Sequence, residues 1–265
     1  MEQIDYRAMI RNLRISRKLG QNFLMNHAVA RTEANFGADK VVLEMGPGLG
    51  ILTRELCKTA KKVIAVERDE VLFGILEGSL RQKNLELIKS DFFKVPVGRL
   101  AADIMISNIP YNLSSRVVMW LGEQQMPGFV CIQREFAEHM VSKPGERNYS
   151  KLSVMCSLLF TVTYVMDVSR NDFYPVPKVD SALVFLKPRE VSIDKKTSGI
   201  ISALMMHKKK KLRNALIDSA KVIGLDKDEA MAISEQLPSK DKRGFQATPE
   251  EILETAKQVK KKIIP

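Results

Sequence analysis

The sequence predicts an α/β fold with a doubly wound, mostly parallel sheet, followed by a small all-helical domain. Short apolar and β-branched runs alternate with amphipathic segments that are long enough for crossover helices, which is the rhythm of βαβ units. Past the last of these runs the strand-like pattern stops, and helical patterns follow one another to the end. A chain of 265 residues can bury one sizeable core and carry a second, smaller unit.

Five runs are expected to form the parallel strands, because each has the length of a buried strand. The predicted strands are 41–45, 63–67, 85–88, 103–107 and 129–133, and the predicted helices are 52–59, 71–80, 114–122 and 136–141. Two later runs, 161–168 and 182–187, are separated by a proline-rich loop rather than by a helix. We therefore expect an antiparallel pair that closes the sheet.

The helical patterns after Pro188 define the second domain. They cover 199–206, 208–222, 227–236 and 249–262. The last pattern begins at Thr248–Glu251 with an N-cap residue, a first-turn proline and first-turn acids, the usual order of a helix start. We expect a larger domain over 1–189, which includes a basic N-terminal arm, and a helical domain over 190–265.

The charge balance favours a polyanionic partner. The chain carries 42 Lys and Arg against 31 Asp and Glu, a formal net charge of +11, which draws a protein towards phosphate backbones. A generic basic soluble protein is the alternative. The three cysteines and three histidines are scattered without disulfide or metal-ligand spacing, so no metal site is expected.

No targeting or membrane signal stands out in the sequence. The N-terminal stretch up to Gln21 lacks the continuous apolar core of a signal peptide. No later stretch approaches the ~20 apolar residues that a membrane span requires. We therefore expect a cytoplasmic protein without a membrane partner.

The stretch Asn108–Tyr111 directly follows a predicted strand and is suited to hold an exocyclic amine on a flat ring. The side-chain oxygen of Asn108 and the main-chain carbonyl beside Pro110 are acceptors for the two amine protons, and Tyr111 offers a face for stacking. This pattern indicates chemistry at adenine N6. On the tetrapeptide alone, a proline-containing turn after a strand is an equal alternative.

A glycine-rich loop, Gly46-Pro-Gly48-Leu-Gly50, follows the first predicted strand and opens a helix. Glycines there allow a tight turn that brings the backbone close to a nucleotide-like cofactor. A dinucleotide fingerprint requires glycine where this chain has Ile51, so a ligand other than NAD is favoured. With Glu44 before it, the loop resembles the first motif of class I S-adenosylmethionine-dependent methyltransferases, where it packs against the amino acid part of the cofactor. A glycine-rich turn without a ligand is the alternative.

Acidic residues also follow the next two predicted strands. Glu67, roughly twenty residues past the glycines, can accept hydrogen bonds from both ribose hydroxyls, and Arg68 stands beside it. Asp91 and Phe92 follow the third strand and are suited to hydrogen-bond and cover an adenine edge. Because ligands bind at the carboxyl edge of open α/β sheets, we expect these residues to lie together with Asn108.

Two further segments are expected at the same edge of the sheet. The proline-stiffened loop from Phe173 to Ser181 begins with aromatic residues, so we expect Phe173 to stack on the target base opposite Tyr111, as an extruded base requires. Gln21 and Asn22 follow a basic segment and are expected to fold over the cofactor. Simple packing of an aromatic residue in a loop is an equal alternative.

Three basic clusters are expected to bind RNA, although a run of charge usually only solvates a surface. Lys208–Lys211 and Arg213 begin a predicted helix of the second domain. The other two clusters are Lys240, Lys242 and Arg243 in a loop, and Arg11, Arg14, Arg17 and Lys18 near the predicted active edge. Basic residues therefore occur in both domains, which suits an RNA that touches both.

Four motifs, Gly20–Leu24, Glu44–Gly50, Asn108–Asn112 and Phe173–Ser181, occur in this order and closely resemble those of the ribosomal RNA adenine N6,N6-dimethyltransferases. The resemblance runs from near Ser16 through the C-terminal helices and favours the small-subunit enzymes of the KsgA type, in an archaeal form. It implies a class I methyltransferase fold with a Rossmann-like seven-stranded sheet and S-adenosylmethionine as cofactor. It also implies dimethylation of two adjacent adenosines in the last hairpin loop of small-subunit rRNA, during subunit biogenesis.

The resemblance further implies the role of each matching residue. Gln21, Asn22, Leu24, Gly46, Gly48, Glu67 and Asp91 are implied at the cofactor, and Asn108, Tyr111 and Phe173 at the target base. We expect a monomer whose partner is the small ribosomal subunit or its precursor. Two alternatives are a large-subunit rRNA dimethylase of the macrolide-resistance type and a non-catalytic RNA-binding assembly factor.

Overall fold

The computed structural model describes residues 6–11, 13 and 20–263. By its internal contacts the chain divides into two compact units. The first takes the described residues up to Leu121 together with 126–134 and 163–186, and the second takes 122–125, 135–162 and the residues from Lys187 onward. The predicted domain boundary between 189 and 190 stays a prediction.

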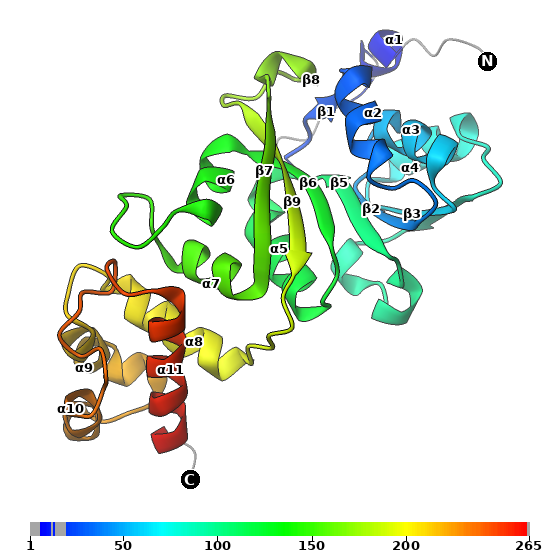
Figure 1. Cartoon of the computed structure of the whole chain (residues 1–265). Helices are drawn as coiled ribbons and strands as arrows, with labels where there is room; N and C mark the ends of the chain where they lie inside the picture. Colours follow the sequence, from blue (N-terminus) through cyan, green and yellow to red (C-terminus); the bar gives the residue numbers. More distant parts are fainter. Residues whose placement is uncertain (1–5, 12, 14–19, 264–265) are drawn as a thin grey trace. The chain divides into compact units, whose positions relative to one another are not determined.

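A seven-stranded sheet forms the frame of the fold, with the strand order β4-β3-β2-β5-β6-β9-β7 (Figure 1). Its strands are β2 (Val41–Met45), β3 (Lys62–Glu67), β4 (Leu85–Lys89), β5 (Ile104–Asn108), β6 (Gly128–Gln133), β7 (Phe160–Val168) and β9 (Ser181–Pro188). Neighbouring strands from β4 to β6 are parallel, whereas β9 is antiparallel to β6. The predicted α/β fold class and all five predicted parallel strands are confirmed.

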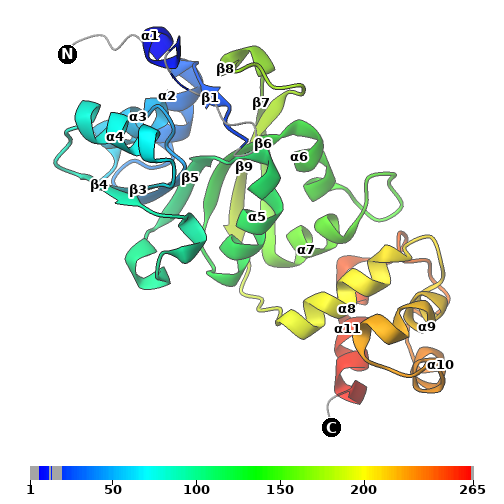
Figure 2. The ribbon, with the colours of Figure 1, turned by 180° about the vertical axis from the view of Figure 1, so that it is seen from behind.

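The crossover helices of the first unit also lie where the amphipathic segments predicted them. They are α3 (Ile51–Thr59), α4 (Glu70–Ser79) and α5 (Ser114–Glu123). Figure 2 shows α5 lying across the face of the sheet that is hidden in Figure 1. Two helices near the N-terminus were not predicted, α1 (Tyr6–Arg11) and α2 (His27–Asn35). The side chain of Asn26 caps α2 by accepting hydrogen bonds from the amides of Ala28 and Val29.

A separate two-stranded sheet joins segments that are about 150 residues apart in the sequence. Strand β1 (Phe23–Leu24) pairs antiparallel with β8 (Phe173–Tyr174), with Leu24 opposite Phe173. Both Leu24 and Phe173 are buried in the apolar core of the first unit. This pairing brings the predicted cofactor segment and the predicted base-stacking segment side by side.

The second unit is helical. Its helices include α7 (Lys151–Leu159), α8 (Lys195–Met206), α9 (Leu212–Ile223), α10 (Lys227–Glu235) and α11 (Pro249–Ile263), and α6 (Arg134–Val141) also lies mostly in it. Helix α7 was not predicted. Helix α11 begins at a capping box, in which the Thr248 hydroxyl accepts from the Glu251 amide and the Glu251 carboxylate accepts from the Thr248 amide.

The prediction that a helix begins at Lys208 is wrong, because α9 begins only at Leu212. Lys208–Lys211 form the turn between α8 and α9. Lys211 pairs with Arg243 in an isolated bridge, and the amide of Leu212 donates to the carbonyl of Lys242. The backbone of this basic turn is therefore held by the loop before α11. No helix in the described part of the chain is long and apolar enough to cross a membrane.

Candidate active site

The carboxyl ends of the parallel strands open into a cavity of about 1090 Å³, part of which is open solvent. Its lining includes nearly all the predicted site residues, namely Gln21, Asn22, Gly46, Gly48, Glu67, Arg68, Asp91, Phe92, Asn108, Pro110, Tyr111 and Phe173. Leu24 is the exception, since it lines a smaller neighbouring cavity. The strand-end residues therefore lie at one edge of the sheet, as expected. The role of each residue stays a prediction.

The glycine-rich loop between β2 and α3 adopts a backbone that suits glycine. Gly46, Gly48 and Gly50 have φ angles of 67°, 59° and 78°, in the left-handed region. A Cβ added at Gly46 would have no heavy atom within 4 Å, so this part of the loop borders open space in the cavity wall. A Cβ at Gly50 would instead lie 2.6 Å from Leu80 Cδ1, inside the apolar packing.

Glu67 ends β3 and is held by backbone amides. Its carboxylate accepts from the Gly48 amide at 3.3 Å and from the Asp69 amide at 2.7 Å. Burial raises its pKa, and the hydrogen bonds from the backbone oppose that rise. Asp69 in turn accepts from Gln21 Nε2 at 3.1 Å, which ties the predicted cofactor segment to the start of α4. A carboxylate has about four lone-pair sites, so Glu67 keeps capacity for ribose hydroxyls.

Asp91 and Phe92 follow β4 and form the next part of the wall. Asp91 caps a short 3₁₀ helix by accepting from the Phe93 amide at 3.0 Å, and its other oxygen lies 3.8 Å from Arg68 Nη1. Phe92 is buried. The guanidinium of Arg116, on the first turns of α5, lies 3.6 Å from the centre of the Phe93 ring. Arg116 also lines the cavity, and the sequence pattern did not point to it.

The stretch Asn108–Tyr111 leaves β5 and turns into the cavity wall. The Pro110 carbonyl already accepts from the Leu113 amide at 2.8 Å. The carbonyl of Ile109, on the other side of the peptide bond to Pro110, accepts from no backbone amide of the described residues. Of the two main-chain carbonyls beside Pro110, that of Ile109 is therefore the one available to a ligand.

Tyr111 and Phe173 reach the cavity from two different segments. The Tyr111 hydroxyl lies 2.7 Å from Ser181 Oγ at the start of β9, and burial raises the pKa of Tyr111. Phe173 lines the cavity while most of its ring is packed in the core, with 4% of its surface exposed. A hydrogen bond fixes the first ring and packing fixes the second, so both are held rigidly.

Two buried acids lie behind the cavity. Glu44 on β2 is 2% exposed, and burial raises its pKa to about 8, with the charge of Glu67 adding to the rise. Glu33 on α2 is fully buried, and burial raises its pKa well above the ordinary value. Sequence reasoning did not single out Glu33. Among the described residues, no group of three or more His, Cys, Asp or Glu side chains is placed to hold a metal ion.

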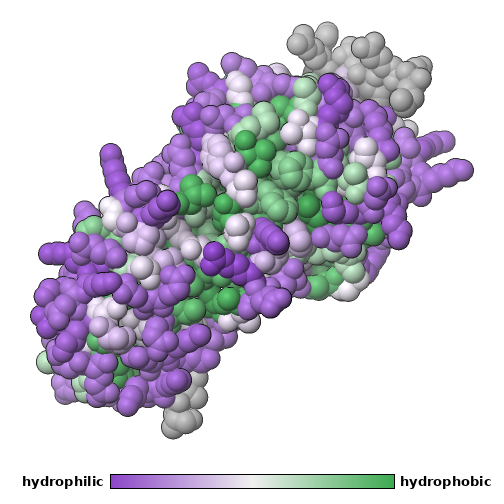
Figure 3. Space-filling view, in the orientation of Figure 1, coloured by the Kyte–Doolittle hydropathy of each residue, from purple (hydrophilic) through white to green (hydrophobic). Residues whose placement is uncertain are grey.

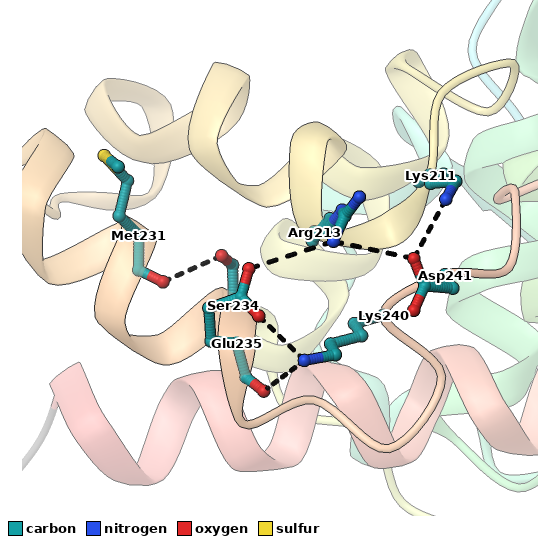
Figure 4. Close-up of polar contacts among 7 residues, drawn as sticks. All are labelled: Lys211, Arg213, Met231, Ser234, Glu235, Lys240 and Asp241. Atoms are coloured by element: carbon teal, nitrogen blue, oxygen red, sulfur yellow. Dashed lines mark hydrogen bonds and ion pairs between the residues drawn. The ribbon is translucent and has the colours of Figure 1, made fainter.

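Within the second unit, acidic side chains pair with five of the eight cations in its two basic clusters, namely Lys210, Lys211, Arg213, Lys240 and Lys242. Figure 4 shows Asp241 between Lys211, at 2.9 Å, and Arg213, at 3.6 Å, while Glu235 accepts from Lys240 at 2.7 Å. Hydrophilic residues cover most of the face over α9 and α10 (Figure 3). The third basic cluster is Arg11, Arg14, Arg17 and Lys18, of which Arg14, Arg17 and Lys18 lie outside the described residues.

The sheet order, the glycine loop and the acids at successive strand ends define an S-adenosylmethionine-dependent methyltransferase. A model of the ribosomal RNA adenine dimethylase family matches residues 12–243. The chain belongs to this family, and it is an S-adenosylmethionine-dependent rRNA adenine dimethyltransferase.

Relatives from archaea are similar over nearly the whole chain. A probable ribosomal RNA small subunit methyltransferase A from Thermococcus gammatolerans is 41% identical, covering 92% of this chain and 88% of the relative. A protein of the same name from Methanopyrus kandleri is 36% identical and covers 97% of both chains. The relatives are archaeal, in line with the lineage that the sequence favoured.

Solved structures show the same fold. A dimethyladenosine transferase from Plasmodium falciparum is similar with a TM-score of 0.76 and 26% identity, covering 91% of this chain and 98% of that one. The 23S rRNA methyltransferase ErmE is similar with a TM-score of 0.58 and 25% identity, covering 90% and 99%. The similarity to both extends beyond the methyltransferase sheet into the C-terminal helices.

Proposed function

We propose that this enzyme dimethylates N6 of two adjacent adenosines in the 3′-terminal hairpin loop of small-subunit rRNA, during assembly of the small ribosomal subunit. The curated archaeal relatives carry the name of a small-subunit methyltransferase, which supports this target. The similarity to a dimethyladenosine transferase, stronger than that to a 23S rRNA enzyme, supports it as well.

The observation that carries the proposal is that Asn108–Tyr111 and the glycine loop line one cavity. Asn108 Oδ1 and the Ile109 carbonyl would accept the two protons of the adenine amine. The rings of Tyr111 and Phe173 would hold the extruded base between them. Pro110 fixes the backbone of this turn and so keeps the two acceptors at a constant separation.

The cavity residues fit S-adenosylmethionine. Gly46 and Gly48 would approach its amino acid part, Glu67 its ribose hydroxyls, and Asp91 and Phe92 its adenine, with Arg68 beside Asp91. The segment containing Gln21, Asn22 and Leu24 would cover it from the side of β1. When bound, the cofactor supplies a methyl group on a sulfonium, which is a good electrophile.

The chain's own residues would act mainly by positioning. The adenine amine is a weak nucleophile because its lone pair is delocalised into the ring. Acceptors at Asn108 and Ile109 favour the pyramidal form, in which the lone pair of N6 is free to bond to the methyl carbon. The extra proton then leaves N6 to solvent, so no strong general base is required at the site.

Binding of the RNA would involve both units. We propose that the predicted helical domain over 190–265 contacts rRNA, and that the basic residues up to Lys18 add contacts near the active edge. The net charge of +11 supports long-range attraction to a ribosomal particle. We further propose that the protein acts as a monomer in the cytoplasm, with the small subunit or its precursor as partner.

The direct test is to incubate the protein with radiolabelled S-adenosylmethionine and undermethylated ribosomal subunits. We expect label in N6,N6-dimethyladenosine of small-subunit rRNA, and its loss in the Asn108→Ala variant while subunit binding persists. Label confined to large-subunit rRNA would identify the macrolide-resistance type of enzyme instead. Subunit binding without label for the wild-type protein would indicate an assembly factor without catalysis.

A further inference from the structure

Glu33 is a fully buried acid on α2. It lies on the buried side of α2 with Val29, Ala30 and Ala34, and its exposed fraction is 0%. Neither carboxyl oxygen of Glu33 has a hydrogen-bond partner among the described residues. Burying an ionisable group without a partner is costly, and such groups concentrate at functional sites.

Asn108 also has a buried oxygen, Oδ1, that lacks a hydrogen-bond partner among the described residues. The side chain of Asn108 lies close enough to Glu33 to lower the pKa of that carboxyl by hydrogen bonding, against the larger opposite effect of burial. Two acceptor oxygens cannot form a hydrogen bond with each other. Either the Glu33 carboxyl is protonated and donates to Oδ1, or the side-chain amide of Asn108 is flipped, so that Nδ2 rather than Oδ1 faces Glu33.

Only one of these two arrangements suits the proposed role of Asn108. If a protonated Glu33 donates to Oδ1, the acceptor is consumed and the amide nitrogen is left for the target. If instead Nδ2 of Asn108 donates to the Glu33 carboxyl, Oδ1 is free to accept from the adenine amine. An ionised carboxylate can only accept, so it permits the second arrangement alone.

We propose that Glu33 is a positioning residue, which accepts a hydrogen bond from Asn108 Nδ2 and thereby turns Oδ1 towards the target amine. This inference rests on the proposed role of Asn108. Among the described residues, Asn108 from β5 and Glu44 from β2 act on the pKa of Glu33, and Glu33 in turn acts on the pKa of Cys131 from β6. None of them is a cation that would satisfy the carboxyl in place of Asn108.

The test compares Glu33→Gln and Glu33→Leu with the wild type. Glutamine keeps the size of the side chain, but it can accept from Nδ2 or donate to Oδ1 equally well, so it no longer selects one orientation. Leucine removes the buried polar group altogether. We expect both variants to bind S-adenosylmethionine with unchanged affinity, measured by calorimetry, and to methylate undermethylated subunits roughly 10- to 100-fold more slowly in single-turnover assays.

Stability separates positioning from a structural role. Glu33→Leu removes the desolvated carboxyl but also the acceptor of Asn108 Nδ2, so the melting temperature should stay close to that of the wild type while the rate falls. A Glu33→Leu variant that melts below the wild type in proportion to its loss of rate would overturn the proposal. The matched control is Glu55→Gln on α3, a buried acid that pairs with Lys58 at 2.7 Å away from the cavity, for which the rate should be unchanged.

A double-mutant cycle with Asn108→Ala completes the test. If Glu33 acts through Asn108, adding Glu33→Gln to Asn108→Ala should slow methylation no further. The wild-type rate should also rise with pH as Glu33 ionises, and Glu33→Gln should lose that dependence. Full activity of Asn108→Ala would refute the proposed role of Asn108 itself, whereas an inactive Asn108→Ala beside a fully active Glu33→Gln would refute only the positioning role.

Discussion

Two alanine substitutions in the glycine loop separate backbone strain from steric collision. Gly46 and Gly50 both have left-handed backbones, with φ of 67° and 78°. An alanine in that region costs about 1–2 kcal/mol, partly offset by about 0.4–1 kcal/mol from the reduced freedom of the unfolded chain. For Gly46→Ala nothing else is added, because no atom lies within 4 Å of the new methyl group. We expect a loss of about 1 kcal/mol in the free energy of unfolding.

Gly50→Ala adds a collision to the same strain. Its methyl carbon would lie 2.6 Å from Leu80 Cδ1 and 2.7 Å from Leu76 Cδ2. Both leucines are buried, at 4% and 0% exposure, so neither side chain can swing away freely. Overpacking of this kind costs about 1–3 kcal/mol more, which gives a total of about 2–4 kcal/mol.

Chemical denaturation and calorimetry with S-adenosylmethionine are the two assays. Gly50→Ala should be clearly the less stable variant. Gly46→Ala should be the one that weakens cofactor binding, by about tenfold if one contact worth ~1.4 kcal/mol is blocked. Equal stabilities for the two variants would refute the packing argument, and unchanged cofactor affinity for Gly46→Ala would remove Gly46 from the binding surface.

Three further outcomes are expected. The pKa of Glu44 is raised from 4.5 to about 8, so between these pH values the folded protein holds a proton that the unfolded chain lacks. The free energy of unfolding should therefore fall as the pH rises from about 4.5 to 8. Denaturant titrations at several pH values should show this fall for the wild type and a flatter dependence for Glu44→Gln. Tyr111→Phe loses the hydrogen bond to Ser181 and about 1 kcal/mol of stability, but it keeps the aromatic ring and should keep most of the methylation rate. Tyr111→Ala removes the ring and should raise the KM for the ribosomal subunit. Asp241→Ala releases two cations from exposed ion pairs, so the melting temperature should hardly change while RNA affinity and its salt dependence increase in binding titrations.

Local signals explain how much of the fold and the site was predictable. Four of the parallel strands, β2, β3, β5 and β6, are short runs that are buried along most of their length, so composition alone marks them, whereas β4 is mostly half-buried. The position of Glu67, Asp91 and Asn108 after such runs then places them at one edge, since parallel strands end on the same side of a sheet. The left-handed angles of the glycine loop follow from the same local logic, because only glycine adopts them without strain.

Tertiary contacts explain what the sequence pattern could not give. The run Lys208–Lys211 has good helical propensity, yet it forms a turn because its backbone bonds to the loop at Lys242 and Arg243. Nor can the number of basic residues show how many remain available to RNA. Asp241 engages two of the cations in the predicted RNA-binding clusters, and it lies about 30 residues from Lys211 in the sequence.

Helix α2 was missed for a reason that bears on function. Its buried side reads Val29, Ala30, Glu33 and Ala34, so an acid interrupts the apolar stripe by which an amphipathic helix is recognised. A helix that only packed against the sheet would gain by having leucine at this position, because the carboxyl of Glu33 is desolvated without a partner among the described residues. Glu33 is therefore both the residue that obscures the helical pattern and a residue whose burial requires a chemical explanation. The proposed hydrogen bond from the side-chain amide of Asn108 is that explanation.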